Sequence, residues 1–299
     1  MNEQSVSVFL NPTAGRGRAG RRLAAIRSLF SAAAQPIELF ISDAIGDLEA
    51  QVEREVGRGA RRIVVVGGDG SVNEAVNGLQ RADADCSMGL IPSGTGNDFA
   101  KASDIPLDWE LAAKTLVQRL VYEQAPRHID IGRVNERYFA NGVGIGFDAK
   151  VTRIARSIRL PIGNSVYLLA LLRGLADGVA TPELTIKAGD VFFQGPATLA
   201  TICNGAFVGG LFHIAPPANN ADGSLDLLIA DPVSRSRILT PLPKLMRGQH
   251  MHEPEVTHQL VDQVSITASA PVESHFDGEV QPLLDRFEIE ILRGRLRLL

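Results

Sequence analysis

The chain has 299 residues, 45% of them hydrophobic and 21% charged, with a formal net charge of −4, as in an ordinary soluble globular protein of about two domains. The acidic balance and the scarcity of aromatic residues argue against a nucleic-acid-binding protein, and two isolated cysteines exclude a disulfide framework and favour a reducing compartment. No basic leader and no run of 18 apolar residues is found, so we expect a cytoplasmic protein without a transmembrane segment.

The first 125 or so residues alternate between apolar strands and helices. We expect strands at 5–10, 37–41, 62–66 and 88–91, and helices at about 18–31, 47–58, from 72 and 108–121. This alternation predicts a parallel sheet covered by helices on both faces, in a domain spanning 1–127. In such sheets ligands bind at the carboxyl ends of the strands.

After residue 125 the pattern changes to short β-like runs separated by turn residues. The runs lie at 128–134, 137–140, 183–187, 191–195, 197–204, 224–230, 263–268 and 287–292, with helical insertions at about 150–178 and 234–247. We therefore expect a second, mainly antiparallel β domain at 128–299, whose last strand returns toward the first domain.

Three turns rich in glycine and small polar residues follow successive strands of the first domain. They are Asn11-Pro12-Thr13-Ala14-Gly15, Gly67-Gly68-Asp69-Gly70 and the segment 92–98, Pro-Ser-Gly-Thr-Gly-Asn-Asp. A glycine-rich turn before a helix directs backbone N–H groups and the positive end of the helix dipole at one point, which favours an anion. A single such turn is equally well explained by a tight turn with a helix-capping aspartate, but three of them together favour a phosphate site.

Common nucleotide motifs fit poorly. The P-loop pattern is absent because Arg21-Arg22 follows Gly20, and the spacing G-x-G-x-x-G at 15–20, with Glu38 on the next strand, is only a weak dinucleotide signal. No Gly-x-Ser-x-Gly sequence supports a serine hydrolase. The pair His250 and His252 lacks further ligands and is interpreted as surface residues rather than a metal site.

The sequence VVVGGDGSVNEAVNGL at 64–79, with NPTAG before it and IPSGTGNDFAK after it, resembles the diacylglycerol kinase catalytic domain family, which includes sphingosine and ceramide kinases. The resemblance continues through IDIGRVNERYFANGVGIGFDAKV at 129–151, CNGAFVGGLFHIAPPANNADGSLDLLIA at 203–230 and HFDGEV at 275–280. Six motifs in order cover nearly the whole chain. They imply a lipid kinase that transfers the γ-phosphoryl group of Mg-ATP to a lipid hydroxyl, with the active site in the cleft between the domains.

The resemblance also implies site residues. Those implied to hold the nucleotide are Asn11, Pro12, Thr13, Ala14, Gly15, Ser42, Gly67, Gly68, Asp69, Gly70, Ser71, Val72, Asn73, Gly94, Thr95, Asn97 and Asp98, with Asp69 and Asp98 near Mg²⁺. Asp277 or Glu279 is implied as the catalytic base, with Asp69 as a further catalytic residue, although Asp-Gly is also the commonest hairpin turn. A structural Mg²⁺ is implied at Asp222 with the carbonyls of Asn219 and Ser224 and with Asp130 nearby, where the alternative is a plain Asp-Gly turn.

Two other functions stay open from the sequence. The GGDG turn followed by Asn73-Glu74 is shared with NAD kinases, which phosphorylate a soluble acceptor, and a non-catalytic lipid-binding module is the third hypothesis. For Glu74 the alternative is a solvated acid in the first turn of its helix. The acceptor is expected to be diacylglycerol or a related glycerolipid, reached from the inner face of a membrane, and the oligomeric state is left open.

Overall fold

A computed structural model describes residues 5–158, 160, 163 and 165–299, and the chain divides into two compact units. Unit 1 comprises Met1–Ile129 and Gly294–Leu299, and unit 2 comprises Asp130–Arg293. The division thus falls two residues after the boundary expected from the sequence, and the last six residues belong to the first unit.

Unit 1 is built on a parallel sheet with the strand order β2-β1-β3-β4, extended beyond β4 by the end of β16. The strands are β1 Val6–Leu10, β2 Ile37–Ile41, β3 Arg62–Gly67 and β4 Ser87–Pro92, and β16 covers Leu284–Leu298. Strands β3 and β4 are almost wholly buried, because helices cover both of their faces.

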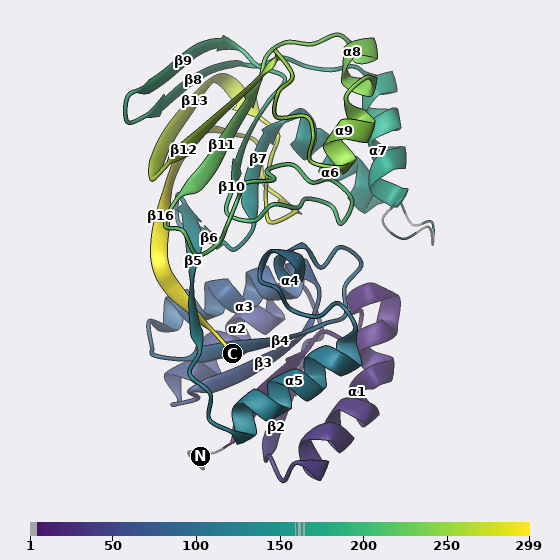
Figure 1. Cartoon of the computed structure of the whole chain (residues 1–299), viewed down its shortest axis with the longest axis vertical. Helices are drawn as coiled ribbons and strands as arrows, with labels where there is room; N and C mark the ends of the chain where they lie inside the picture. Colours follow the sequence, from purple (N-terminus) through teal and green to yellow (C-terminus); the bar gives the residue numbers. More distant parts are fainter. Residues whose placement is uncertain (1–4, 159, 161–162, 164) are drawn as a thin grey trace. The chain divides into compact units, whose positions relative to one another are not determined.

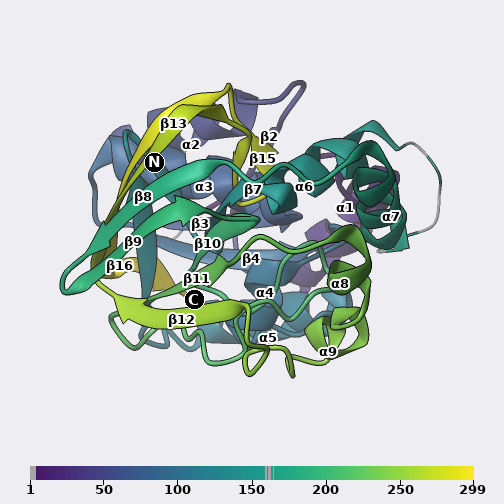
Figure 2. The same ribbon diagram turned by 90° about the horizontal axis from the view of Figure 1, so that it is seen from above.

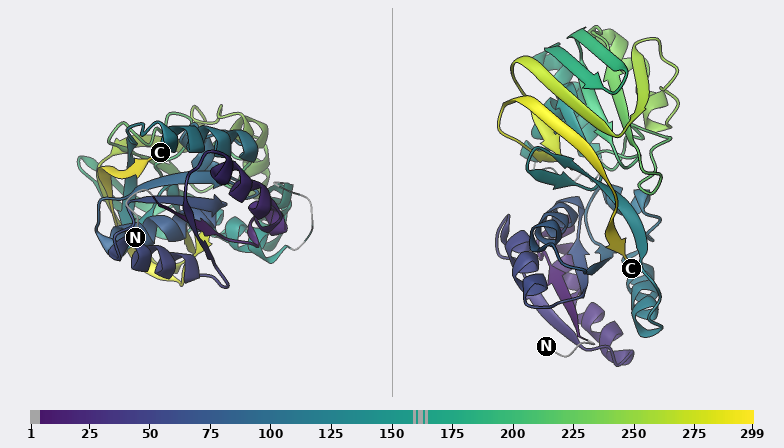
Figure 3. Two further views of the ribbon diagram at one scale, coloured as in Figure 1. Left: turned by 90° about the horizontal axis from the view of Figure 1, so that it is seen from below. Right: turned by 90° about the vertical axis from the view of Figure 1, so that its left-hand side faces the viewer.

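Five helices accompany this sheet: α1 Ala14–Ala32, α2 Asp47–Gly57, α3 Asp69–Ala82, α4 Asp98–Ala102 and α5 Trp109–Val121. Helices α1 and α5 lie on one face and α2 and α3 on the other (Figures 1 and 3). The core between α1, α5 and the sheet includes Val8, Phe30, Val64 and Leu116. The carboxyl ends of β1, β3 and β4 run directly into α1, α3 and the turn before α4, which places all three glycine-rich turns at one sheet edge.

Unit 2 contains two sheets (Figure 2). One has the order β16-β13-β8-β9, with β5 paired to β16 and β6 paired to β5, and the other has the order β12-β11-β10-β7-β14-β15. The strands are β5 Arg127–Val134, β6 Arg137–Phe139, β7 Gly142–Gly146, β8 Glu183–Ala188, β9 Val191–Pro196, β10 Leu199–Cys203, β11 Leu225–Ala230, β12 Val256–Val261, β13 Gln263–Val272, β14 Ser274–Phe276 and β15 Glu279–Val280. Buried side chains of both sheets form one core, in which Phe139, Ile202 and Phe287 are fully buried.

In the described part of unit 2, four helices pack outside the second sheet: α6 Phe147–Ser157, α7 Ser165–Asp177, α8 Arg235–Leu239 and α9 Leu242–Met246. They share an apolar cluster in which Ile238 and Leu242 contact the buried side chains of α6 and α7. Each helical insertion expected from the sequence is therefore a pair of helices. The first pair breaks because Ile158 adopts an extended backbone after Ser157.

The expected fold class, an α/β domain with a parallel sheet followed by an antiparallel β domain, is confirmed. Within the described residues no helix is both long enough and apolar enough to cross a bilayer. Strand β7 was missed because its sequence is Gly-Val-Gly-Ile-Gly, and glycine is depleted in strands. Strand β16 is longer than the expected 287–292 because it continues beyond Arg293 into unit 1.

Candidate active site

The three glycine-rich turns touch one another. A Cβ built on Gly68 would lie 2.7 Å from the Cα of Gly94, and one built on Gly15 would lie 2.0 Å from the carbonyl oxygen of Ser93. The Arg18 side chain bridges the first and third turns, donating from Nε to the Gly15 carbonyl at 3.0 Å and from Nη2 to the Gly94 carbonyl at 2.7 Å. A Cβ atom does not fit at Gly15 or Gly68, so glycine is required at these positions for the turns to converge.

The first turn is fixed by hydrogen bonds of Asn11. Its Oδ1 accepts from the backbone N–H of Thr13 at 3.0 Å and from the Thr13 hydroxyl at 2.7 Å, while its Nδ2 donates to Ser71 Oγ at 3.3 Å. Gly15, Arg16 and Gly17 then adopt left-handed backbone angles at the start of α1. This conformation is unusual for a non-glycine residue, and strained backbone of this kind gathers at functional sites.

The amino end of α3 faces the same point. Gly68 precedes the helix in an extended conformation without a side-chain cap, so the first helical N–H groups have no partner in the helix. Asp69 Oδ1 accepts from the backbone N–H of Phe99 at 3.1 Å, at the start of α4, a contact that neither the phosphate interpretation nor the helix-cap alternative predicted. Asp69 therefore fastens the second turn to the third.

Glu74 caps a helix, which neither interpretation of the sequence predicted. Its Oε2 accepts from the backbone N–H groups of Leu48 at 3.1 Å and Glu49 at 3.3 Å. These donors lie in the first turn of α2, so Glu74 caps a neighbouring helix rather than standing in solvent. The cap holds α2 and α3 together.

The third turn is shaped by Asn97, which has a left-handed φ of 52° and accepts from the Gly94 N–H at 2.9 Å. Asp98 is 5% exposed and pairs with Lys101, with 3.0 Å between Oδ1 and Nζ. Ser42 is buried next to the end of β1, where its N–H donates to the Leu10 carbonyl. Of the remaining sequence candidates, Asn73 is buried on α3 and Thr95 is exposed.

The described residues of unit 1 fit a bound phosphate chain. The turns meet at glycine positions, the first N–H groups of α3 have no partner within the helix there, and Arg18 and Arg22 approach the third turn. Burial lowers the pKa of Arg22 and the neighbouring charges of Arg18 and Arg21 lower it further, while the charge of Asp108 offsets part of this effect. A cluster of arginines that repel one another in this way is stabilised by an anion.

In unit 2 the Asp277-Gly278 turn joins β14 to β15, and both residues have positive φ, 49° and 81°. The expected hairpin is thus present in a type I′ geometry. The Asp277 carboxylate accepts from three backbone N–H groups, those of Ala140 at 2.7 Å, Asn141 at 2.8 Å and Gly142 at 2.9 Å. Asp277 therefore holds the segment before β7 in place.

Glu279 is differently placed. Its Oε2 pairs with Nη1 of Arg156 on α6 at 2.7 Å, and its side chain is 34% exposed. Burial would lower the pKa of Arg156, but the hydrogen bond and charge of Glu279 outweigh this effect and raise it. Arg156 also donates to the Gly278 carbonyl at 2.9 Å, so one arginine fixes the turn and one carboxylate oxygen.

The residues expected at a structural Mg²⁺ lie close together in unit 2. Asp130 Oδ2 accepts from the Gly223 N–H at 2.8 Å, Asp222 Oδ1 accepts from the Ser224 N–H at 3.0 Å, and Asn219 Oδ1 accepts from the Ala221 N–H. Two carboxylates and backbone carbonyls are oxygen ligands suited to Mg²⁺. Among the described residues no group of three or more His, Cys, Asp and Glu side chains forms a metal site.

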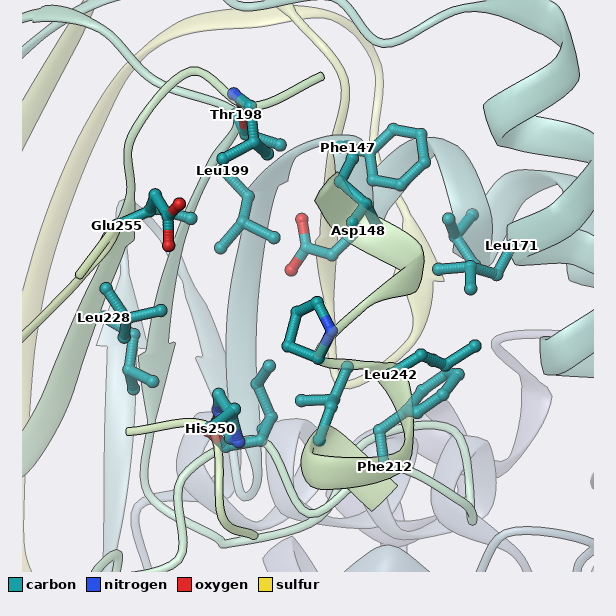
Figure 4. A pocket seen from close by; sticks show the side chains of 18 of the residues that line it. Phe147, Asp148, Leu171, Thr198, Leu199, Phe212, Leu228, Leu242, His250 and Glu255 are labelled. Carbon is teal, nitrogen blue, oxygen red and sulfur yellow. Dashed lines mark hydrogen bonds between the residues drawn. The ribbon is translucent and has the colours of Figure 1, made fainter. Parts of the chain in front are cut away.

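Unit 2 also contains an apolar pocket of about 170 Å³. Figure 4 shows Leu199 and Leu228 on one side, Phe212 and Leu242 on the other, and the Asp148 carboxylate directed into the space between them. The other lining residues come mainly from α6 to α9, β10 and β11, and include Val151, Thr152, Tyr167, Leu171, Ile214, Ile229, Val233, Arg237, Ile238, Leu245, His250, Glu253, Glu255 and Val256.

His250 was expected at the surface, and this was wrong. It is 5% exposed and lies in the pocket wall, where Nε2 contacts the Ile214 carbonyl at 3.0 Å, whereas His252 is exposed. Burial lowers the pKa of His250 below its ordinary value. Its sequence neighbours gave no signal of burial, because the histidine lies in a loop without periodicity.

Several residues of these sites were not found from the sequence. Arg18 and Arg22 tie turns together, and Asn204, 1% exposed, donates to the carbonyls of Asp130 and Ala140. Asn204 lies within the motif at 203–230, which is the only sequence signal that could have marked it.

Comparison with known proteins agrees with this architecture. A family model described as the diacylglycerol kinase catalytic domain matches residues 5–134, and one described as the YegS C-terminal NAD kinase beta sandwich-like domain matches residues 141–299. Together these two models cover both units of the chain.

Relatives of similar length carry one enzyme name. Diacylglycerol kinase of Bacillus subtilis is 29% identical over 279 residues, covering 93% of this chain and 90% of the relative, and that of Mycobacterium tuberculosis is 31% identical over 258 residues, covering 84% and 81%. The chain therefore belongs to the diacylglycerol kinase family, a family of lipid phosphotransferases, and the resemblance drawn from the six motifs is confirmed.

Solved structures share the fold. A diacylglycerol kinase from Bacillus anthracis has a TM-score of 0.73 at 22% identity, and a second structure from that organism has a TM-score of 0.82 at 24% identity. Each covers 99% of this chain and 96% of the other chain.

Proposed function

We propose that this protein transfers the γ-phosphoryl group of Mg-ATP to the hydroxyl of a lipid, with diacylglycerol or a related glycerolipid as the acceptor. The observation that carries the proposal is the mutual contact of three glycine-rich turns at the amino end of α3, in a chain of this kinase family. Phosphoryl transfer depends mainly on positioning and charge stabilisation, and both can be supplied by such turns.

The nucleotide is assigned to unit 1. We propose that the backbone of the 11–15 and 67–73 segments holds the phosphates, with Thr95 and Asn97 beside them and Ser42 at the nucleoside. Bound Mg²⁺ would neutralise charge on the phosphates, and Asp69 and Asp98 are the carboxylates that the second and third turns themselves carry. Asp98 is buried with Lys101 as its counter-charge, so the lysine would compete with the cation for this carboxylate.

The acceptor is assigned to unit 2, because the pocket there is lined mostly by aliphatic and aromatic side chains, with few charged groups. An apolar cavity of this kind suits the hydrocarbon part of a lipid. A water-soluble acceptor such as NAD would gain little from such a lining. Access to lipid implies that the protein works at a membrane surface.

We propose Glu279 rather than Asp277 as the general base. The acceptor oxygen forms a bond to the γ-phosphorus, the bond from that phosphorus to the β-γ bridging oxygen breaks, ADP leaves, and the acceptor proton passes to the base. A carboxylate that already accepts three backbone N–H groups, as Asp277 does, has little capacity left for this proton. Glu279 has only Oε2 engaged by Arg156 among the described residues.

The same reasoning gives Asp130, Asn219, Asp222 and Ser224 a structural role in unit 2. Asn219, Asp222 and Ser224 form a turn that contains the buried Asn220 and leads into strand β11, and Asp130 lies on β5. We propose that a Mg²⁺ ion held by Asp222 and the carbonyls of Asn219 and Ser224, with Asp130 behind it, stabilises this turn.

The test is a transfer assay with purified full-length protein, Mg²⁺ and γ-labelled ATP. The acceptors are diacylglycerol, phosphatidylglycerol, a sphingoid base and ceramide in mixed micelles, with NAD as a separate soluble acceptor. Label in the organic phase supports the proposal and identifies the acceptor. Labelled NADP, or nucleotide binding without any transfer, would contradict it.

The base is tested in the same assay. Glu279→Gln should lower kcat by about 10²–10⁴-fold, as expected when a general base is removed. Glu136→Gln, in the exposed turn between β5 and β6, is the matched control and should keep wild-type kcat. A Glu279→Gln variant with wild-type kcat would refute the assignment.

A further inference from the structure

A polar pair, the half-buried Asp148 and the buried His275, lies between the apolar pocket and the turn Asp277-Gly278-Glu279 of unit 2, which we call the acidic turn. On three neighbouring strands, Thr201 of β10 and His275 of β14 both face Gly144 of β7 in register. A Cβ on Gly144 would lie 2.1 Å from Asp148 Oδ2 and 2.4 Å from His275 Nε2. The missing side chain of Gly144 thus makes the space in which Asp148, from the first turn of α6, meets His275.

The pair is incompletely bonded. Asp148 Oδ1 accepts from the Ala149 N–H at 2.8 Å and Oδ2 accepts from the Thr201 hydroxyl at 2.9 Å. His275 is 3% exposed as a side chain, and its Nε2 lies 3.7 Å from Asp148 Oδ2 without a hydrogen-bond partner in the part of the chain that the structure describes. A buried ring nitrogen in this state gains from a shift of under about 1 Å, which would complete a charge-assisted hydrogen bond.

Each member of the pair also belongs to another site. His275 Nδ1 accepts from the Gly278 N–H at 3.2 Å, so in the neutral ring the proton lies on Nε2, which faces Asp148. Gly278 separates Asp277 from Glu279, while the Asp148 carboxylate lines the apolar pocket (Figure 4). A continuous set of contacts therefore runs from the pocket to the proposed base.

We propose that Asp148 and His275 are positioning residues that couple the filling of the pocket by an acyl chain to the geometry of the acidic turn. The proposal rests on the proposed function of this site. An acyl chain displaces water from the Asp148 carboxylate, and a less solvated carboxylate attracts the Nε2–H of His275 more strongly. The closed pair fixes the imidazole, and through Nδ1 it fixes Gly278 and the orientation of Glu279.

The coupling predicts that kcat depends on acyl-chain length. With diacylglycerol as the acceptor, the wild-type protein should turn over the didecanoyl form about 10- to 100-fold faster than the dibutyryl form, since one charge-assisted hydrogen bond changes rates by this order. If another lipid of the panel is the acceptor, its short- and long-chain forms replace these probes.

Two variants separate coupling from a merely structural role. His275→Asn keeps an acceptor oxygen near the Gly278 N–H but removes the Nε2–H, and Asp148→Asn keeps the shape but removes the charge. Each should lower kcat for the long-chain lipid to that of the short-chain lipid, with KM for ATP unchanged. The double variant should be no slower than either single variant, because both remove the same contact.

The matched control is His258→Asn. His258 of β12 is half-buried and contacts the buried Asp226, with Nε2 2.6 Å from Oδ1, and among the described residues no hydrogen bond joins it to the acidic turn. This variant should keep the dependence of kcat on chain length. If both Asp148→Asn and His275→Asn keep the wild-type ratio of kcat between long-chain and short-chain lipid, the coupling is overturned but the proposed function is not. If the wild-type protein phosphorylates no lipid, the proposed function and the coupling are both overturned.

Discussion

The contact between the second and third glycine turns leads to a prediction about Gly68→Ala. Gly68 has φ of −109° and ψ of −165°, an extended conformation that alanine also adopts, so the effect of the substitution is steric. The added Cβ would lie 2.7 Å from the Cα of Gly94, whereas carbon atoms pack at about 3.5–4.0 Å. The two turns must therefore separate by about 1 Å.

A separation of this size has consequences for stability and for catalysis. Overpacking of a tight contact costs about 1–3 kcal/mol, which for a unit of this size lowers Tm by about 3–12 °C. Misplacement of phosphate-binding groups by about 1 Å lowers kcat by about 10²-fold. We expect both effects, together with weaker binding of ATP.

The assay combines calorimetric titration with a non-hydrolysable ATP analogue, thermal unfolding and the lipid transfer assay. Gly57→Ala is the matched control, because no atom lies within 4 Å of its added Cβ at the end of α2. This control should bind nucleotide normally and unfold at the same temperature or slightly higher. A Gly68→Ala variant with wild-type affinity and kcat would refute the argument that the closeness of these turns builds the phosphate site.

Three further predictions concern other contacts. Glu74→Ala removes the acceptor for two N–H groups of α2 and should lower the free energy of unfolding by about 0.5–2 kcal/mol in chemical denaturation; an unchanged midpoint would show that water replaces the cap. Burial lowers the pKa of His250 below 6.5, so the neutral ring stabilises the folded state above pH 6.5, and this contribution is lost as the pH falls further. The variant His250→Gln should therefore flatten the pH dependence of Tm between pH 7 and 5. The control His252→Gln, at the exposed position, should leave this pH dependence unchanged. Gly144→Ala places a methyl group against Asp148 and should lower Tm and abolish the chain-length dependence of kcat, so a variant with normal kinetics would contradict the arrangement of this pair.

The strand and helix pattern of unit 1 could be predicted from the sequence because its period is local. Strand β3 is a run of β-branched residues that ends in glycine, and α3 follows with an amphipathic pattern, so neither depends on distant residues. The convergence of the three turns also follows from the sequence, since parallel strands end at one edge of the sheet. The structure adds the glycine contacts and the bridge made by Arg18.

The sites of unit 2 could be predicted less completely, because antiparallel strands bring together residues that are far apart in the sequence. Asp277 was selected by its motif, but only the structure shows that its carboxylate binds the N–H groups of residues 140–142. The pocket is lined by residues of α6 to α9, of β10 to β12 and of the loops beside them, and its apolar residues carry no distinguishing pattern one by one. His275 had no signal of its own beside the motif.

The sequence by itself determined the alternation of elements, the position of the glycine turns and membership of the family, because backbone conformation and motif order are properties of short segments. The tertiary structure decided that the Asp277 carboxylate binds backbone N–H groups whereas Glu279 pairs with Arg156, which helix Glu74 caps, and that Asp148 and His275 meet over Gly144. These are decided by contacts between residues tens to more than a hundred positions apart, and such contacts exist only once the sheets and helices have packed together.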